Sequence, residues 1–371
     1  MVTNKKYALS FKLYNEDEVT LLSEITLSSQ SAQQINIGEH AVINLVSIQL
    51  DSPLTQNTLY AYDFILDDGQ TKHSLANLLP ELRYPSHAFF NFTLKSDIQQ
   101  IFHGSCRKPH FDSPDGLVQV DNVISESSNN AALRPSMLIM SGDQIYADDV
   151  AGPTLVAIHQ VIELLGLYDE KWTGYNSVNA SDELFNHPFC YYQRDELLPK
   201  STVKQSFFRK LFSINKQPVF TSDSAKNHLV TLAEVFAMYL LVWSPALWRL
   251  VNLNSNKVAP AFQEKYKTET KRIQSFVADL PQVSRALAHI PVYMIFDDHD
   301  ITDDWNLTRG WEEDAYGNPF SKRIIGNTLI GYWLCQGWGN APEKFSELNS
   351  QAHHTFREIA MNSKISLLMK Y

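Results

Sequence analysis

Apolar and polar positions alternate through much of the first 90 residues, which is the period of a half-buried strand. The runs that fit this period best are Tyr7–Tyr14, Ala41–Leu50 and Thr58–Leu66. Asp68-Gly69 after the third run is a turn signal, and the polar segment 28–34 is expected to be a loop. The pattern predicts a small antiparallel β-sandwich over residues 1–90, without a residue cluster that suggests chemistry.

Three short apolar runs later in the chain end abruptly in residues capable of chemistry. They are Ile98–His103, Met137–Met140 and Val292–Phe296. The segments that follow them read GSCR, SGDQIYADD and DDHDITDDWN. Short apolar runs suit buried strands of an α/β sheet, and ligands of such sheets collect at the carboxyl ends of the strands. The sequence therefore predicts that these polar segments contribute to a metal site.

Helical periodicity marks much of the chain between the second and third of these runs. Thr154 is a suitable N-cap for a helix that Gly166 would stop, and Pro281 is expected to break a later amphipathic helix. The predicted helices are Thr154–Leu165, Leu229–Leu241, Glu264–Leu280, Lys322–Cys335 and the final stretch to Tyr371. The Ser- and Asn-rich segment through Asn130 is expected to be a loop. Residues 154–289 are predicted to be a helical insertion in a domain that spans residues 91–371.

The composition narrows the class of protein. A chain of 371 residues is long enough for two domains, or for one large α/β domain with an appendage, and its 44% hydrophobic content predicts a substantial core. A net charge of −10 argues against general nucleic-acid binding and against attraction to anionic membranes. Three cysteines are too few for a disulfide framework, and the N-terminus shows neither a signal peptide nor a twin-arginine motif. A cytoplasmic protein without a membrane span is expected.

The polar segments supply the ligands that a hydrolytic centre of two metal ions needs. The Asp143 carboxylate can bridge two ions, and a Tyr146 phenolate and a Cys106 thiolate can complete the coordination of one of them. Asp298 would then ligate the second ion. His299 is the candidate general acid, and Arg107 can hold a phosphate oxygen through its planar guanidinium.

Structural roles for the same residues stay open at this point. Cys106 can be a small buried hydrophobe, and His299 can be a structural histidine. Four neighbouring aspartates can be helix caps or solvated loop charges, namely Asp148, Asp149, Asp303 and Asp304. Asp297 and Asp300 can lie in a second sphere around a metal ion or face solvent.

Three segments in order, HGSCRKP, GDQIYADDVAGP and FDDHDITDDWN, resemble successive blocks of the PhoD-like alkaline phosphatases, within the calcineurin-like metallophosphoesterase superfamily. GYWLCQGWGN is similar to a later block of that family, and the resemblance covers about residues 85–340. It implies an α+β fold, in which an N-terminal β-sandwich precedes a metallophosphoesterase-type β-sandwich core faced by helices. It also implies metal ligands at Cys106, Asp143, Tyr146 and Asp298, with Fe³⁺ and Ca²⁺ as the ions, or Mn²⁺ or Zn²⁺ in their place.

The chain also departs from the pattern of that superfamily. The superfamily completes its site with two later blocks that carry histidines, and neither block follows Asn306 in this sequence. His353-His354 lies in a polar context without a preceding glycine or strand, so the missing roles are not assigned to it. The catalytic domain is therefore expected to be truncated at its C-terminus.

Together the motifs predict a metal-dependent phosphoric-ester hydrolase, a phosphatase or phosphodiesterase, that uses a metal-activated hydroxide and His299 as general acid. A phosphate ester is the expected substrate. The alternative is a non-catalytic truncated relative that binds metal or a partner protein. A third alternative is a diesterase that acts on lipid headgroups or nucleic acid.

Overall fold

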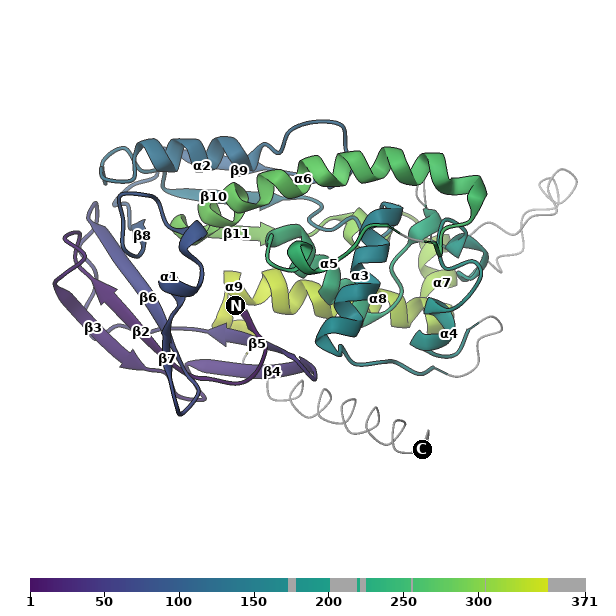
Figure 1. Ribbon diagram of the computed structural model, residues 1–371, viewed down its shortest axis with the longest axis horizontal. Coiled ribbons are helices and arrows are strands. Elements are labelled where there is room, and N and C mark those ends of the chain that lie inside the picture. Colours follow the sequence, from purple (N-terminus) through teal and green to yellow (C-terminus); the bar gives the residue numbers. More distant parts are fainter. Residues whose placement is uncertain (173–177, 201–218, 221–224, 255, 304, 346–371) are drawn as a thin grey trace, which may run out of the picture.

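A computed structural model describes residues 1–345 of the chain, apart from 173–177, 201–218, 221–224, 255 and 304. These residues form antiparallel sheets, one parallel sheet and α-helices, consistent with the expected α+β class. The antiparallel sheets lie at one end of the molecule, and most of the helices lie towards the other end (Figure 1). The predicted helix to Tyr371, with His353-His354, lies outside the described residues.

Two antiparallel sheets occupy the first part of the chain. Their strands are β1 Val2–Thr3, β2 Ala8–Tyr14, β3 Leu21–Thr26, β4 Ala32–Gly38, β5 Ala41–Val46, β6 Leu59–Asp67, β7 Lys72–Ser74 and β8 Phe90–Thr93. One sheet has the order β1-β5-β4, and the other has the order β3-β2-β6-β7, with β8 also paired to β6. The three strands predicted from alternation are present as β2, β5 and β6.

The expected loop over residues 28–34 is wrong in its second half, because its last residues belong to β4. β4 pairs antiparallel with β5. The Ile35 and Ile37 side chains that follow are buried in the same core as Leu155 of the helical part. Pairing and burial therefore outweigh the weak strand preference of the two glutamines at the start of β4.

The three later apolar runs form one parallel sheet. Its strands are β9 Ile101–Gly104, β10 Met137–Ser141 and β11 Val292–Ile295, in the order β11-β10-β9. The register places Leu138 of β10 beside Phe102 on one side and Val292 on the other. The three polar segments that were predicted to act together therefore start from one edge of one sheet.

Helices cover one face of this sheet. They are α2, Leu117–Glu126, and α6, Gln263–His289. These two helices lie side by side over the sheet (Figure 1), and Leu138 and Met140 of β10 are buried against them. On the opposite face Ile101, Tyr293 and Ile295 are 43%, 47% and 52% exposed. The edge that carries the polar segments therefore borders a sheet face that is partly exposed.

Both covering helices correct the sequence-based expectation. α2 lies in the segment that was expected to be a loop, and Leu117 and Ile124 occupy its buried face. α6 does not break at Pro281. Leu280 and Val283 are fully buried on either side of this proline, so packing holds both halves in one helix despite the missing N–H donor.

The remaining described α-helices are α1 Leu75–Leu78, α3 Gly152–Leu165, α4 Ser181–Phe185, α5 Leu232–Trp243, α7 Arg309–Gly317, α8 Pro319–Tyr332 and α9 Trp338–Asn340. α3 ends at Gly166, whose φ of 55° is the left-handed conformation expected at a helix stop. Thr231 and Glu234 form a capping box at the start of α5. α8 begins before the predicted Lys322 and continues into a π-helical turn over Trp333–Gly337.

The block GYWLCQGWGN, from the end of α8 through α9, makes structural contacts. The Gln336 amide donates to the Tyr239 hydroxyl over 2.8 Å. Asn340 bonds both backbone groups of Met294, with its Oδ1 3.1 Å from the amide N and its Nδ2 2.6 Å from the carbonyl O. Asn340 thereby satisfies backbone groups at the outer edge of β11.

The expected domain boundaries stay a prediction. The boundary at residue 90 coincides with the first residue of β8, which pairs with β6. Helices α3 to α6 lie between β10 and β11 along the chain, and the expected insertion over residues 154–289 stays a prediction as well.

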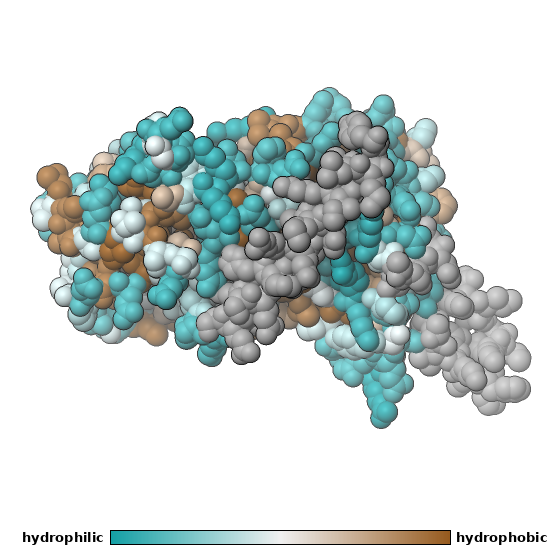
Figure 2. All heavy atoms as spheres, turned by 90° about the horizontal axis from the view of Figure 1, so that it is seen from below, coloured by the Kyte–Doolittle hydropathy of each residue, from teal (hydrophilic) through white to brown (hydrophobic). Residues whose placement is uncertain are grey.

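Hydrophobic residues gather over the end that carries the antiparallel sheets when the molecule is seen from below (Figure 2). Val19, which precedes the edge strand β3, is 82% exposed, and Leu21 and Leu22 at the start of this strand are 45% and 48% exposed. Among the described residues, no helix combines the length and the apolar character that crossing a membrane requires.

Candidate metal centre

Close approach of two strand ends shapes the centre. Gly142 follows β10 with a φ of 153°, and a Cβ at this position would lie 2.2 Å from Ser105 Oγ and 3.1 Å from Cys106 Sγ. Glycine therefore allows the β10 end to pass against the GSC turn that follows β9. Cys106 and Tyr146 have φ angles of 56° and 47°, which are uncommon for residues with a side chain. These backbone conformations direct the thiol and the phenol towards Asp143.

Three aspartates form the anionic part of the centre. One carboxylate oxygen from each of Asp143, Asp297 and Asp298 lies within 4.8 Å of the others. Asp143 is buried, Asp298 is half-buried and Asp297 is exposed. Like charges this close repel one another, and a cation would relieve the repulsion. Asp143 and Asp298 are carboxylates that the sequence analysis singled out as ligands, and the fold brings Asp297 to them as well.

Asp143 also accepts hydrogen bonds from the other two predicted ligands. The Tyr146 hydroxyl and the Cys106 thiol both donate to its carboxylate. Burial raises the pKa of Asp143, and burial together with the Asp143 charge raises the pKa of Tyr146. A metal that binds here has to displace the phenol proton, which makes its affinity pH-dependent. The four residues predicted as metal ligands, which include Asp298, thus lie together.

His299 lies beside this cluster and is held by Asp148. Its Nδ1 lies 2.8 Å from Asp148 Oδ2, and its backbone N–H donates to Asp143 Oδ1 over 3.1 Å. The imidazole stacks on the Tyr146 ring, with centroids 5.1 Å apart. The bond to Asp148 raises the pKa of His299 to about 9, while burial raises the pKa of Asp148 to about 6. His299 therefore carries a proton at neutral pH.

Asp300 fixes the loops after β10 and β11 relative to each other. It is 2% exposed, and its Oδ1 accepts the backbone N–H groups of Gln144 and Ile145 over 2.8 Å and 2.7 Å. Burial raises the pKa of Asp300 to about 8. Of the two roles left open for Asp300, the solvent-facing one is excluded by this burial.

Two aspartates that hold basic side chains beside the centre were not predicted from the sequence. Asp148 and Asp149, expected to be caps or solvated charges, are buried and pair with His299 and Lys108. His110 Nε2 lies 3.6 Å from the same Asp149 carboxylate. Burial opposes the ionisation of Asp149, but His110 and Lys108 outweigh it and lower its pKa to about 2. The two adjacent aspartates in the segment YADD could have indicated this role. Adjacent aspartates alone, however, do not show which side chains point into the protein.

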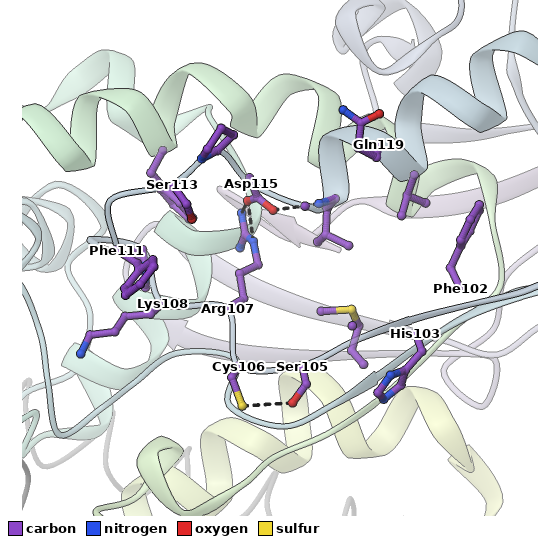
Figure 3. Close-up of a pocket in the computed structure, with 18 of the residues that line it drawn as sticks. Phe102, His103, Ser105, Cys106, Arg107, Lys108, Phe111, Ser113, Asp115 and Gln119 are labelled. Carbon is purple, nitrogen blue, oxygen red and sulfur yellow. Dashed lines mark hydrogen bonds and ion pairs between the residues drawn. The ribbon is translucent and has the colours of Figure 1, made fainter.

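Arg107 does not point to the centre, although its neighbour Cys106 does. Its guanidinium pairs with Asp115 over 2.6 Å and packs on the rings of Trp243 and Phe276, at 4.8 Å and 4.5 Å from their centroids. Figure 3 shows the Arg107 and Cys106 side chains on opposite sides of the turn. The phosphate contact expected from the sequence does not fit this placement, because Arg107 is 8% exposed and anchors the turn to the helices.

A groove of about 720 Å³ borders the centre. Four residues of the centre and its surroundings line it, namely Cys106, Lys108, Tyr146 and His299. Its other walls combine polar residues such as His103, Ser113 and Gln119 with apolar ones such as Phe102 and Phe111 (Figure 3). This size lies within the range of pockets that hold small organic ligands.

Comparisons with known proteins add little to this geometry. No family model matches the sequence, and no curated protein matches it. A solved structure described as "Structure of PhoD" is similar at 10% sequence identity and a TM-score of 0.29. The similarity covers 87% of this chain and 39% of that chain, so this chain spans about two fifths of the length of that structure. A likeness of this size does not establish a shared function.

Proposed function

We propose that the chain is a metal-dependent phosphoric-ester hydrolase. The observation that supports this most directly is the convergence of three carboxylates, a thiol, a phenol and a protonated histidine at the ends of three parallel strands. Carboxylates and a phenol are ligands for hard metal ions, and a protonated histidine can serve as a general acid. The combination suits phosphate esters, whose cleavage requires charge neutralisation and protonation of a leaving oxygen.

The donor set fits metal ions. We assign Cys106, Asp143, Tyr146 and Asp298 as ligands, and Asp297 is a further candidate because it belongs to the same cluster. Oxygen donors with one thiol suit iron together with calcium, manganese or zinc. When bound, the ions supply an activated water and neutralise charge on the phosphoryl group.

The protein itself contributes the proton and its placement. His299 is proposed to donate a proton from Nε2 to the leaving oxygen, while Asp148 holds Nδ1 and orients the ring. The stacking of the imidazole on Tyr146 keeps it beside the ligands. Asp300, in the loop after β11, accepts backbone N–H groups of the loop after β10 and so fixes the two loops relative to each other. The groove would accommodate the organic part of the ester.

Hydrolysis of aryl phosphates by the purified chain tests this proposal. The protein is loaded in turn with iron, calcium, manganese and zinc. We expect turnover with at least one of these metals or a pair of them, loss of turnover after chelation, and recovery when metal is added back. Parallel assays with p-nitrophenyl phosphate and bis(p-nitrophenyl) phosphate separate a phosphatase from a diesterase. Metal-loaded protein that cleaves neither ester would contradict the proposal and favour the non-catalytic alternative.

Changing His299 to glutamine is expected to lower kcat by about 10²–10⁴-fold without changing the metal content. The loss should be largest for alkyl phosphates, because an alkoxide needs the proton more than p-nitrophenolate does. Steady-state kinetics on both substrates measure this difference. His103→Gln is the matched control, since His103 also lines the groove but bonds Ser141. Equal losses for both leaving groups in the His299 variant would exclude a role as general acid.

A further inference from the structure

A second cation stands beside the centre, held by the other member of the aspartate doublet. Lys108 pairs with Asp149, and its Nζ lies 5.5 Å from the centroid of the Tyr146 ring. The same ring stacks with His299, which pairs with Asp148. Both side chains line the groove. The Tyr146 ring therefore has a lysine and a histidine as neighbours, and each of them is held by one aspartate.

Lys108 combines a fixed position with access to a ligand. The Asp149 side chain is 10% exposed and holds the ammonium group, whereas the Lys108 side chain is 30% exposed. An ammonium group has three N–H donors, so a contact with one carboxylate oxygen leaves donors for another acceptor. Arg107 differs in both respects, because its side chain is 7% exposed and its guanidinium faces Asp115. Figure 3 shows that Arg107 and Lys108 leave the turn in different directions.

We propose that Lys108 binds a phosphate oxygen at the centre and that Asp149 positions it for this contact. The inference rests on the proposed function, since it places the phosphoryl group of the ester, or free phosphate, between Lys108 and His299. The chain has a net charge of −10, which repels a phosphate anion. A cation next to the phosphate has to offset this repulsion. A charge-assisted hydrogen bond of this kind contributes about 10–100-fold in affinity.

Binding of inorganic phosphate tests this inference separately from turnover. Inorganic phosphate is titrated calorimetrically into the protein as purified. The titration is repeated after the protein has been saturated with the metal ion that it was found to bind. We expect Lys108→Ala to weaken phosphate binding at least about tenfold, and Lys108→Arg to retain most of the affinity because it keeps the charge. Lys265→Ala is the matched control. Lys265 also lies over a tyrosine ring, 5.2 Å from the centroid of Tyr192, but is not among the groove-lining residues, so its variant should bind phosphate normally.

Kinetics supply a second measurement. The KM of a phosphate ester should rise in Lys108→Ala by about the same factor as the Kd of phosphate, with a smaller change in kcat. Equal phosphate affinity in the Lys108→Ala and Lys265→Ala variants would overturn the assignment, and so would a wild-type protein that binds no phosphate. Weaker phosphate binding by Lys108→Ala in a protein that cleaves no ester would support the anion site and reject the hydrolase.

The folded state of the variant is checked by its metal content and its unfolding temperature, both expected at wild-type values. If Lys108→Ala loses metal as well, the phosphate affinity of the Lys108→Arg variant tests the contact instead. Phosphate affinity restored by arginine supports a contact that depends on the charge, and affinity that arginine does not restore overturns it.

Discussion

Changing Asp143 to asparagine is expected to lower kcat/KM for phosphate esters by about 10³-fold or more and to remove bound metal. Asp143 is the buried carboxylate of the acidic cluster and accepts hydrogen bonds from Tyr146 and Cys106. An amide keeps the shape of the side chain but loses the charge, and it turns an NH₂ group towards one of these donors. Metal analysis of the purified variant and steady-state kinetics measure the two effects.

Asp63→Asn is the matched control for this change. Asp63 is also buried, at 1% exposed, and its carboxylate accepts hydrogen bonds from the Ser74 hydroxyl and the Ala76 backbone N–H in the N-terminal part of the chain. Its variant should lose stability while the folded protein keeps its metal content and activity. Wild-type metal content and activity in Asp143→Asn would show that Asp143 is not a ligand.

Changing Glu234 to alanine is expected to lower the free energy of unfolding by about 3–5 kcal/mol. The side chains of Glu234 and Arg194 are both 0% exposed, with Arg194 Nη2 2.7 Å from Glu234 Oε1. His159 Nε2 lies 3.0 Å from the same oxygen. The other oxygen accepts the backbone N–H groups of Val230 and Thr231 before α5. The variant leaves a buried guanidinium without its counter-charge and removes half of the capping box.

The same ion pair predicts how stability depends on pH. Burial opposes the ionisation of Glu234, but Arg194 outweighs it and holds the pKa well below the ordinary value of 4.5. Because the pKa is lower in the folded state, the pair contributes stability above about pH 4.5 and loses it as the pH falls further. Urea midpoints between pH 7 and pH 3 measure this contribution. Glu234→Ala should show a smaller decrease in midpoint over this range than the wild type.

A surface ion pair provides the control for the stability prediction. Glu196 pairs with Lys200, and these side chains are 55% and 40% exposed. Glu196→Ala should therefore change the free energy of unfolding by less than about 1 kcal/mol. A urea midpoint for Glu234→Ala as high as that for Glu196→Ala would contradict the importance of the buried pair.

Local patterns were sufficient for the strands that carry the centre. Each of β9, β10 and β11 is a short apolar run followed by polar residues, and the parallel pairing then brings the three ends to one edge. Asp143 and Asp298 could therefore be proposed as ligands from the sequence, because their chemistry and their position after a strand are both visible there. The proposal of Cys106 as a ligand depended on the family resemblance. α2 was missed although Leu117 and Ile124 are correctly spaced, because its polar neighbours resemble a loop.

Side-chain direction at the centre was not predictable in the same way. Arg107 and Lys108 are adjacent cations in one turn, yet Arg107 is buried against Asp115 and Lys108 pairs with Asp149. Both line the groove, but which of them lies beside the metal centre depends on the backbone of the turn, where Cys106 takes a positive φ. That conformation depends in turn on the close contact with Gly142, which lies in a different part of the sequence.

The sequence by itself determined the residue types at the three strand ends, the strands that precede them and the helical character of the segment between the second and third. The tertiary structure decided which of these residues meet. His299 pairs with Asp148 across 151 positions, and Asp300 bonds the backbone of the loop after β10. Such pairings depend on burial, which makes an unpaired charge costly and so selects partners that are distant in the sequence. A local sequence pattern shows the chemistry of each side chain. It does not show which distant residue compensates that side chain when it is buried.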